Sequence, residues 1–180
     1  MKLTVWGARG SIPVSGEQYV RYGGDTTCVE LETEDGDLVI LDAGSGLRAL
    51  GNQVLSEGRK EVHFLLSHAH WDHLLGFPFF KPLYDRSARI ALYGCLCAQS
   101  SIKEMISDTM TPPNFPVSLK DTHAKVIFHD YQLHENEVGS GFDFDPGVTE
   151  AVNELLSAGG RILERQDTLA VIQPPIQVTS

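Results

Sequence analysis

The stretch LLSHAHWDHLLGF, Leu65–Phe77, holds three histidines and one aspartate within six residues, directly after an apolar run. His68 and His70 are two residues apart, so at the end of a strand both imidazoles would leave the same face and could hold one ion. Asp72 and His73 follow where the chain turns, and a carboxylate beside an imidazole suits a second, neighbouring ion. This density of metal-binding side chains favours a metal site over histidines that only brace a loop.

The other aromatic and imidazole side chains carry weaker signals. Trp71, inside the motif, forms either the wall of a cleft or packing for the turn. His63 belongs to the alternating interior of the preceding strand, so we treat it as structural. His123, His129 and His134 are isolated in the sequence, and for each of them a surface or hydrogen-bonded position is favoured over metal binding.

The composition indicates one soluble, folded domain spanning residues 1–180, with 42% hydrophobic and 21% charged residues. The net charge of -10 argues against a nucleic-acid partner, although a metal-lined pocket could still take a small anionic substrate. No apolar run approaches the roughly 20 residues needed to cross a bilayer, and the first ten residues lack signal-peptide features. We therefore expect no membrane association and a cytoplasmic location. Three cysteines, an odd count, suggest no disulfide framework.

Strand and helix patterns alternate along the chain, which predicts an α/β fold with one sheet system and helices outside it. The clearest period-two run is 26–33, and a turn at 34–37 joins it to the apolar strand 38–42 in a hairpin. Asp42 should emerge at the carboxyl end of that central strand. A helix is predicted over 45–58, with Ser45 able to cap it and Gly58 able to close it. We also expect strands at 2–6, 61–70, 88–94, 124–132 and within 161–175, and helices at 100–110 and 147–160.

Several motifs together resemble a known family. H-A-H-W-D-H fits the H-x-H-x-D-H signature of the metallo-β-lactamase fold, and VILDAGSGLRALG (39–51) looks like that family's first motif. VWGARGSIPVSG (5–16), YGGDTTCVEL (22–31), GFPFF (76–80) and PPNFPVSL (112–119) resemble its phosphodiesterase-like branch, which includes ribonuclease Z and cyclic-phosphodiesterase relatives. The resemblance covers residues 1–130 and leaves 131–180 as a divergent tail. It implies a metallo-β-lactamase-like β-sheet sandwich with outer helices, shortened or incomplete in its second half.

The resemblance also implies a site and a chemistry. His68 and His70 would bind the first divalent metal, Asp72 and His73 the second, and Asp42 would orient one of these ligands. Zinc is the expected metal, with manganese or iron as alternatives. The implied activity is that of a metal-dependent hydrolase acting on a small cyclic or nucleotide-type phosphodiester through a metal-activated water. Asp72 is also the candidate catalytic proton acceptor.

Two points are left open by the sequence. Arg9, in the glycine-rich first loop, is a candidate substrate contact, with bracing of its own turn as an equally favoured role. Members of the family carry a third metal-binding histidine, a bridging aspartate and a further histidine in their second half, but no histidine follows His134 here. The alternatives are a catalytically impaired metal-binding relative, or an assembly protein whose site or sheet is completed by a second copy in a homo-oligomer.

Overall fold

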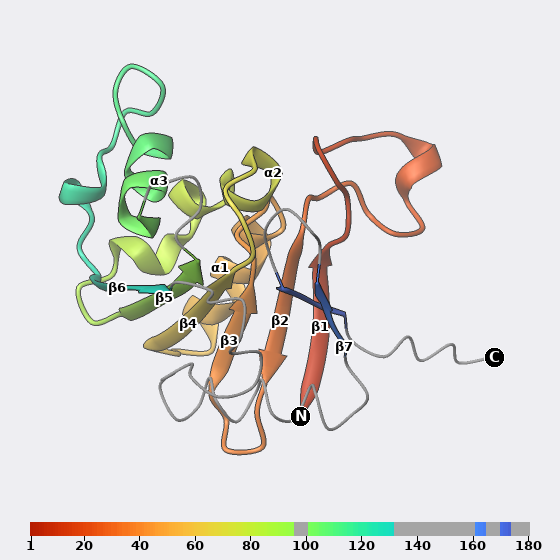
Figure 1. Cartoon of the computed structure of the whole chain (residues 1–180), viewed down its shortest axis with the longest axis horizontal. Coiled ribbons are helices and arrows are strands. Elements are labelled where there is room, and N and C mark those ends of the chain that lie inside the picture. The colour runs from red at the N-terminus through yellow and green to blue at the C-terminus, as the bar shows by residue number, and fades with distance from the viewer. Residues whose placement is uncertain (96–100, 132–160, 165–169, 174–180) are drawn as a thin grey trace.

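The computed structural model describes residues 1–95, 101–131, 161–164 and 170–173. Six strands form one mixed sheet in chain order, β1 to β6, and β7 pairs with β8 in a separate antiparallel ladder (Figure 1). The first three strands of the sheet pair antiparallel, and β3 to β6 pair parallel. The strands are β1 (Lys2–Gly7), β2 (Cys28–Glu32), β3 (Leu38–Leu41), β4 (Glu61–Leu66), β5 (Arg89–Cys95), β6 (Lys125–Tyr131), β7 (Arg161–Glu164) and β8 (Ala170–Gln173). The helices are α1 (Leu47–Ser56), α2 (Trp71–Leu74) and α3 (Ile102–Thr109).

The predicted α/β order is confirmed, including the hairpin, because β2 and β3 pair antiparallel with Val29 opposite Leu41. The predicted central strand is buried on both faces: Leu38, Val39 and Ile40 are each 2% exposed or less. The helix expected over 147–160 lies outside the described residues. None of the helices in the described ranges combines the length and hydropathy needed to cross a membrane.

One detail of the predicted helix at 45–58 is wrong. Ser45 does not cap α1. The N-cap residue is Gly46, which has no side chain that could accept a capping hydrogen bond. The Ser45 hydroxyl instead donates to Asp25 Oδ1 at 2.6 Å, and its backbone N–H donates to Thr26 Oγ1 at 2.8 Å. These contacts tie the start of α1 to the segment before β2. Gly58, at φ 70°, follows the end of the helix in the left-handed conformation that was expected of it.

Helices α1 and α3 cover one side of the sheet. On that side Ile40, Phe64 and Leu92 are fully buried, and the register of the parallel strands places them side by side. The ring of Phe64 meets the rings of Phe77 and Phe80 edge-on, with centroids 5.8 and 5.3 Å apart. The helices contribute Leu47, Leu50, Val54, Ile102 and Ile106 to the same cluster. This packing holds the parallel strands, and therefore their carboxyl ends, in defined positions.

The predicted functional residues lie at those carboxyl ends. Asp42 directly follows β3 and Ser67 directly follows β4, and the two strands pair parallel with Leu41 opposite Leu65. Figure 1 shows α2 at the same end of the sheet as the loop 8–27 that joins β1 to β2. In open α/β sheets the carboxyl ends of parallel strands are the usual place for ligand binding.

The chain approaches itself most tightly behind the histidine motif. A Cβ added to Gly76 would lie 1.9 Å from the Gly44 carbonyl oxygen, and one added to Gly44 would lie 2.5 Å from the Asp72 carbonyl oxygen. Ala43 N–H donates to His73 O at 2.7 Å, and Gly76 N–H donates to Ala43 O at 2.8 Å. The turn after β3 is thus hydrogen-bonded to α2 along the backbone, which is possible only because both close positions are glycine.

Candidate metal centre

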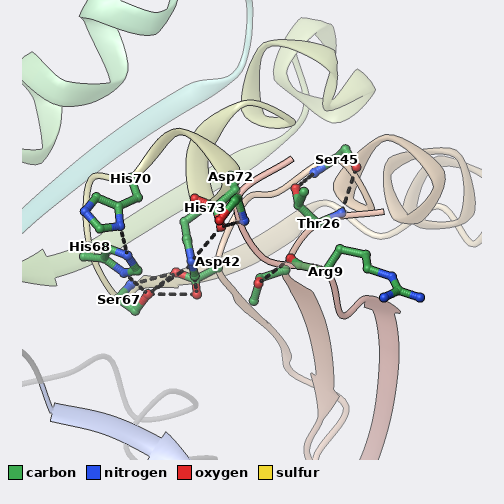
Figure 2. Close-up of polar contacts among 11 residues, drawn as sticks. Arg9, Thr26, Asp42, Ser45, Ser67, His68, His70, Asp72 and His73 are labelled. Carbon is green, nitrogen blue, oxygen red and sulfur yellow. Dashed lines mark hydrogen bonds and ion pairs between the residues drawn. The ribbon is translucent and has the colours of Figure 1, made fainter. Parts of the chain in front are cut away.

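Asp42 lies at the base of the site and is 6% exposed. Its φ of 59° turns the chain sharply at the end of β3, a conformation that aspartate tolerates better than most residues. Its carboxylate accepts hydrogen bonds from the Ser67 backbone N–H at 2.8 Å and from the Ser67 hydroxyl at 2.7 Å. It also accepts from His73 Nδ1 at 2.7 Å (Figure 2). Asp42 therefore links the ends of β3 and β4 to α2.

His73 is oriented by this contact. Because a carboxylate only accepts hydrogen bonds, the His73 ring carries a proton on Nδ1, and in the neutral form of the ring Nε2 keeps a free lone pair. His73 Nε2 faces Asp72 Oδ2 at 3.4 Å. Asp72 is itself 8% exposed, and its Oδ2 accepts a hydrogen bond from the Ser11 backbone N–H at 2.7 Å. One imidazole nitrogen and one carboxylate oxygen therefore point at the same space.

His68 and His70 form a second pair of potential metal ligands. His68 Nε2 lies 2.9 Å from His70 Nδ1, and the ring centroids are 4.3 Å apart. Ser67 Oγ, whose proton goes to Asp42, lies 3.0 Å from His68 Nδ1 and accepts from it. That contact leaves the lone pair of His68 on Nε2, the atom that faces His70 (Figure 2). The two imidazoles lie next to each other, but in the loop after β4, which ends at Leu66, and not on the strand expected over 61–70.

The charges of the site reinforce this arrangement. Burial disfavours protonation of His73, but the hydrogen bond and the charge of Asp42 outweigh it and raise the pKa of His73. Burial, followed by the neighbouring His73 and His70, lowers the pKa of His68. Burial also opposes ionisation of Asp72, yet the Ser11 N–H and the positive charge of His73 prevail and lower its pKa. Asp72 is therefore a carboxylate that ionises readily and a weak base.

The four side chains offer atoms that can bind metal, in two pairs. Two imidazole nitrogens that face each other, and an imidazole nitrogen that faces a carboxylate oxygen, are donor combinations suited to zinc, manganese or iron. The hydrogen bond from His73 to Asp42 is the kind of outer contact that fixes metal-binding histidines. Within the described ranges, however, no group of three or more histidine, cysteine, aspartate or glutamate side chains is arranged to hold an ion. We call His68, His70, Asp72 and His73 the histidine cluster.

Arg9 lies apart from the histidine cluster. Its guanidinium stands over the Tyr19 ring, 4.8 Å from the centroid, and its Nε donates to the Gly23 carbonyl at 3.1 Å. Figure 2 shows the side chain pointing away from the histidines. These contacts support the role of bracing the loop. A substrate contact by Arg9 stays a prediction, with no contact in the structure that favours it.

The remaining described histidines also lie apart from the cluster. His63 stacks on Tyr93 with ring centroids 6.1 Å apart, and Tyr93 in turn stacks on His129 at 4.5 Å. These three rings come from neighbouring strands, β4, β5 and β6. His123 is exposed and its Nδ1 lies 3.1 Å from the Tyr84 carbonyl. His134 lies outside the described residues.

Sequence reasoning missed two residues of the site, Ser67 and Ser11. Ser67 precedes the motif at the end of β4, so its position at a strand end was an available signal. Ser11 is 61 residues from Asp72 and has a φ of 67°, and no local pattern indicates that its backbone N–H would reach that carboxylate.

Comparison with known proteins places this geometry in a family. The sequence pattern described as "Metallo-beta-lactamase superfamily" matches residues 21–90, which span β2 to β4 and the whole histidine cluster. Over these residues the chain resembles the metallo-β-lactamase superfamily. The expected fold is confirmed with it: an α/β fold with a six-stranded mixed sheet and helices.

Curated relatives of this chain include two ribonucleases Z. That of Haloarcula marismortui is 26% identical over 140 residues, which are 75% of this chain and 42% of the relative. That of Thermococcus kodakarensis is 25% identical over 111 residues, 59% of this chain and 35% of the relative. A solved diphosphatase of the PhnP family is 23% identical, covers 76% of this chain and 52% of its own, and has a TM-score of 0.49. The chain thus spans less than half the length of the curated relatives it matches.

Proposed function

We propose that this protein is a metal-dependent hydrolase of phosphodiesters, with a small cyclic or nucleotide-type substrate. His68 and His70 would hold one divalent ion, and Asp72 and His73 a second, with zinc as the favoured metal. Ions at such positions supply Lewis-acid polarisation of a phosphoryl oxygen and water made acidic near neutral pH.

This proposal rests on four side-chain atoms that can bind metal and that face each other in two pairs. His68 Nε2 and His70 Nδ1 are 2.9 Å apart, and His73 Nε2 and Asp72 Oδ2 are 3.4 Å apart. An ordinary loop histidine needs no partner that fixes its tautomer. Here Ser67 and Asp42 each occupy the Nδ1 side of a ring and leave Nε2 turned toward a second donor. The ribonuclease Z relatives support a phosphodiester as the substrate class.

The roles of the individual residues follow from their contacts. Asp42 would position His73, and Ser67 would position His68. Asp72 would act as a metal ligand, because its lowered pKa makes it a poor acceptor for the proton of an attacking water. The earlier assignment of Asp72 as catalytic proton acceptor is therefore the weaker of its two proposed roles.

The test joins metal content with turnover. After loading with zinc or manganese, the wild type should retain metal in elemental analysis and hydrolyse bis(p-nitrophenyl) phosphate. His68→Ala should lower both by about tenfold or more, whereas His123→Ala, a matched histidine outside the cluster, should change neither. Less than about half an equivalent of bound metal in the wild type, together with no turnover, would rule out the hydrolase.

The second candidate function is weak metal binding without hydrolysis. Because no group of three donors forms within the part of the chain that the structure describes, a further ligand is needed for a complete site. His134 or a second copy of the chain could provide it; without it, the protein would be a weak metal binder. His134→Ala should leave metal content unchanged, and a loss equal to that of His68→Ala would make His134 the further ligand. A strictly monomeric mass in solution would exclude a site shared between two chains.

A further inference from the structure

Trp71 is exposed although it lies inside the histidine motif. It is 76% exposed, and the other large apolar side chains above 60% are Val20 at 78%, Tyr22 at 68% and Ile12 at 65%. Among the described residues, the most exposed large apolar side chains therefore belong either to the motif or to the loop 8–27. An exposed large apolar side chain beside a polar site is a candidate for ligand or partner binding.

The exposure of Trp71 argues against the alternative that it packs the turn. The other tryptophan, Trp6, is half-buried and its Nε1 donates to Glu30 at 2.7 Å. Trp71 has no such hydrogen bond, and no aromatic ring or cation in the described ranges stacks on it. An indole that is left open at a fixed position offers a flat face and an unused N–H to a ligand.

One hydrogen bond joins the two chain segments that carry Ile12 and Trp71. The Ser11 backbone N–H donates to Asp72 Oδ2 at 2.7 Å, so the loop 8–27 is attached to α2 at a proposed metal ligand. Ile12 directly follows Ser11, and Trp71 directly precedes Asp72. The two residues joined by this hydrogen bond are thus adjacent in the chain to an exposed isoleucine and an exposed indole.

We infer that Trp71 is a specificity-determining residue that stacks on a flat aromatic ring of the substrate, while the histidine cluster takes the attached phosphate group and Ile12 completes the apolar rim. This inference rests on the proposed function for its phosphate-binding part. Stacking on tryptophan accepts any flat ring, so the ring is either a nucleobase or another aryl group. The position of Trp71, next to Asp72 in the chain, suits a ring carried directly on the phosphorylated part of the substrate.

Tryptophan fluorescence tests the inference without any turnover. The chain has two tryptophans, so Trp6→Phe isolates the signal of Trp71. Zinc-loaded protein is titrated with adenosine 5′-monophosphate, phenyl phosphate and ribose 5-phosphate, and N-acetyltryptophanamide provides the background. If Trp6→Phe loses cooperative unfolding, the difference between wild type and Trp71→Phe supplies the same signal. We expect a saturable change in Trp71 fluorescence with a ring-bearing phosphate and no change with ribose 5-phosphate.

The result also identifies the source of the ring. A saturable change with both ring compounds supports recognition of any aryl group, and a change with adenosine 5′-monophosphate alone supports a nucleobase. Quenching that does not saturate and matches N-acetyltryptophanamide would overturn the inference, as would an equal response to ribose 5-phosphate.

Substitutions at Trp71 separate stacking from simple bulk. Trp71→Leu should weaken binding of the ring-bearing phosphate about tenfold, and Trp71→Phe, which keeps a ring, by less than about threefold. Phe79→Leu is the matched control, because Phe79 is 51% exposed but already packs edge-on against Phe115. Equal losses in Trp71→Leu and Phe79→Leu would contradict the assignment. If ring-bearing phosphates bind but no phosphodiester is hydrolysed, the inference about Trp71 holds and the hydrolase proposal is refuted. If phosphodiesters are hydrolysed without any preference for a ring, the hydrolase proposal holds and the inference about Trp71 is refuted.

Discussion

The base and the rim of the histidine site differ in how the fold treats them. At the base, Asp42 and Asp72 are 6% and 8% exposed, and each accepts hydrogen bonds from the backbone of another segment. At the rim, Trp71 and Ile12 are 76% and 65% exposed. Asp72 and Trp71 are adjacent in the chain, so a short motif supplies both regions. The fold thus stabilises the residues that orient the metal-binding atoms and leaves the side chains next to them in the chain exposed.

The largest loss of stability is expected at Gly76, where the atoms nearest to an added Cβ all belong to the backbone. Gly76→Ala would place a Cβ 1.9 Å from the Gly44 carbonyl oxygen, and no flexible side chain can move to relieve that contact. We expect the free energy of unfolding to fall by about 3 kcal/mol or more, measured by urea denaturation. Gly10→Ala is the control, since nothing lies within 4 Å of its added Cβ, and it should stay within about 0.5 kcal/mol of wild type. Similar values for the two variants would show that α2 is not tightly held.

A smaller effect is expected from Asp42→Asn, which keeps the size of the side chain but removes its charge. Part of its acceptor capacity is lost, so a donor of Ser67 or His73 is left without a partner. The free energy of unfolding should fall by about 1–3 kcal/mol. Zinc affinity, measured by competition with a chelating dye, should fall about 10–100-fold because His73 loses its orientation.

The control for that change is Asp35→Asn, in the exposed turn between β2 and β3. It removes the same charge far from the cluster and should alter neither quantity. If Asp42→Asn bound zinc as tightly as Asp35→Asn, the role of Asp42 in positioning His73 would be wrong.

The smallest effect on stability is expected at the rim. Ile12→Ala removes an apolar side chain that is 65% exposed and therefore contributes little to the core. Its free energy of unfolding should stay within about 0.5 kcal/mol of wild type in the same urea titration. A loss above about 1.5 kcal/mol would mean that Ile12 is packed and that the contrast between base and rim does not hold.

Much of the fold could be predicted because its signals are local. The alternation in β2 and the apolar run of β3 indicate their faces, and the tight turn between them indicates antiparallel pairing. The cap of α1 could not be predicted in this way. Ser45 is a good capping residue by type, but Asp25 and Thr26 from another segment engage it first. A tertiary hydrogen bond outcompeted the local one.

The features of the site also divide into those that local sequence predicts and those that depend on tertiary contacts. The spacing of His68 and His70 at a strand end indicates correctly that the two rings meet. By contrast, the contact of Arg9 with Tyr19 and the hydrogen bond from Ser11 to Asp72 depend on how the loop 8–27 closes over the end of the sheet. Residue type alone favoured Arg9 as a substrate contact as much as a loop brace. The observed contacts of Arg9 favour the brace.

Local sequence patterns specify the kinds of metal-binding atoms, their spacing in the motif and the strands that precede them, because alternation and turn chemistry act over a few residues. Three features depend on the folded chain: which nitrogen of each histidine faces a neighbour, the hydrogen bond from Ser11 to Asp72, and the exposure of Trp71. Those features join segments far apart in the chain. Their distances are set by the packing of parallel strands and by the close approach of Gly44 and Gly76, which no local pattern encodes.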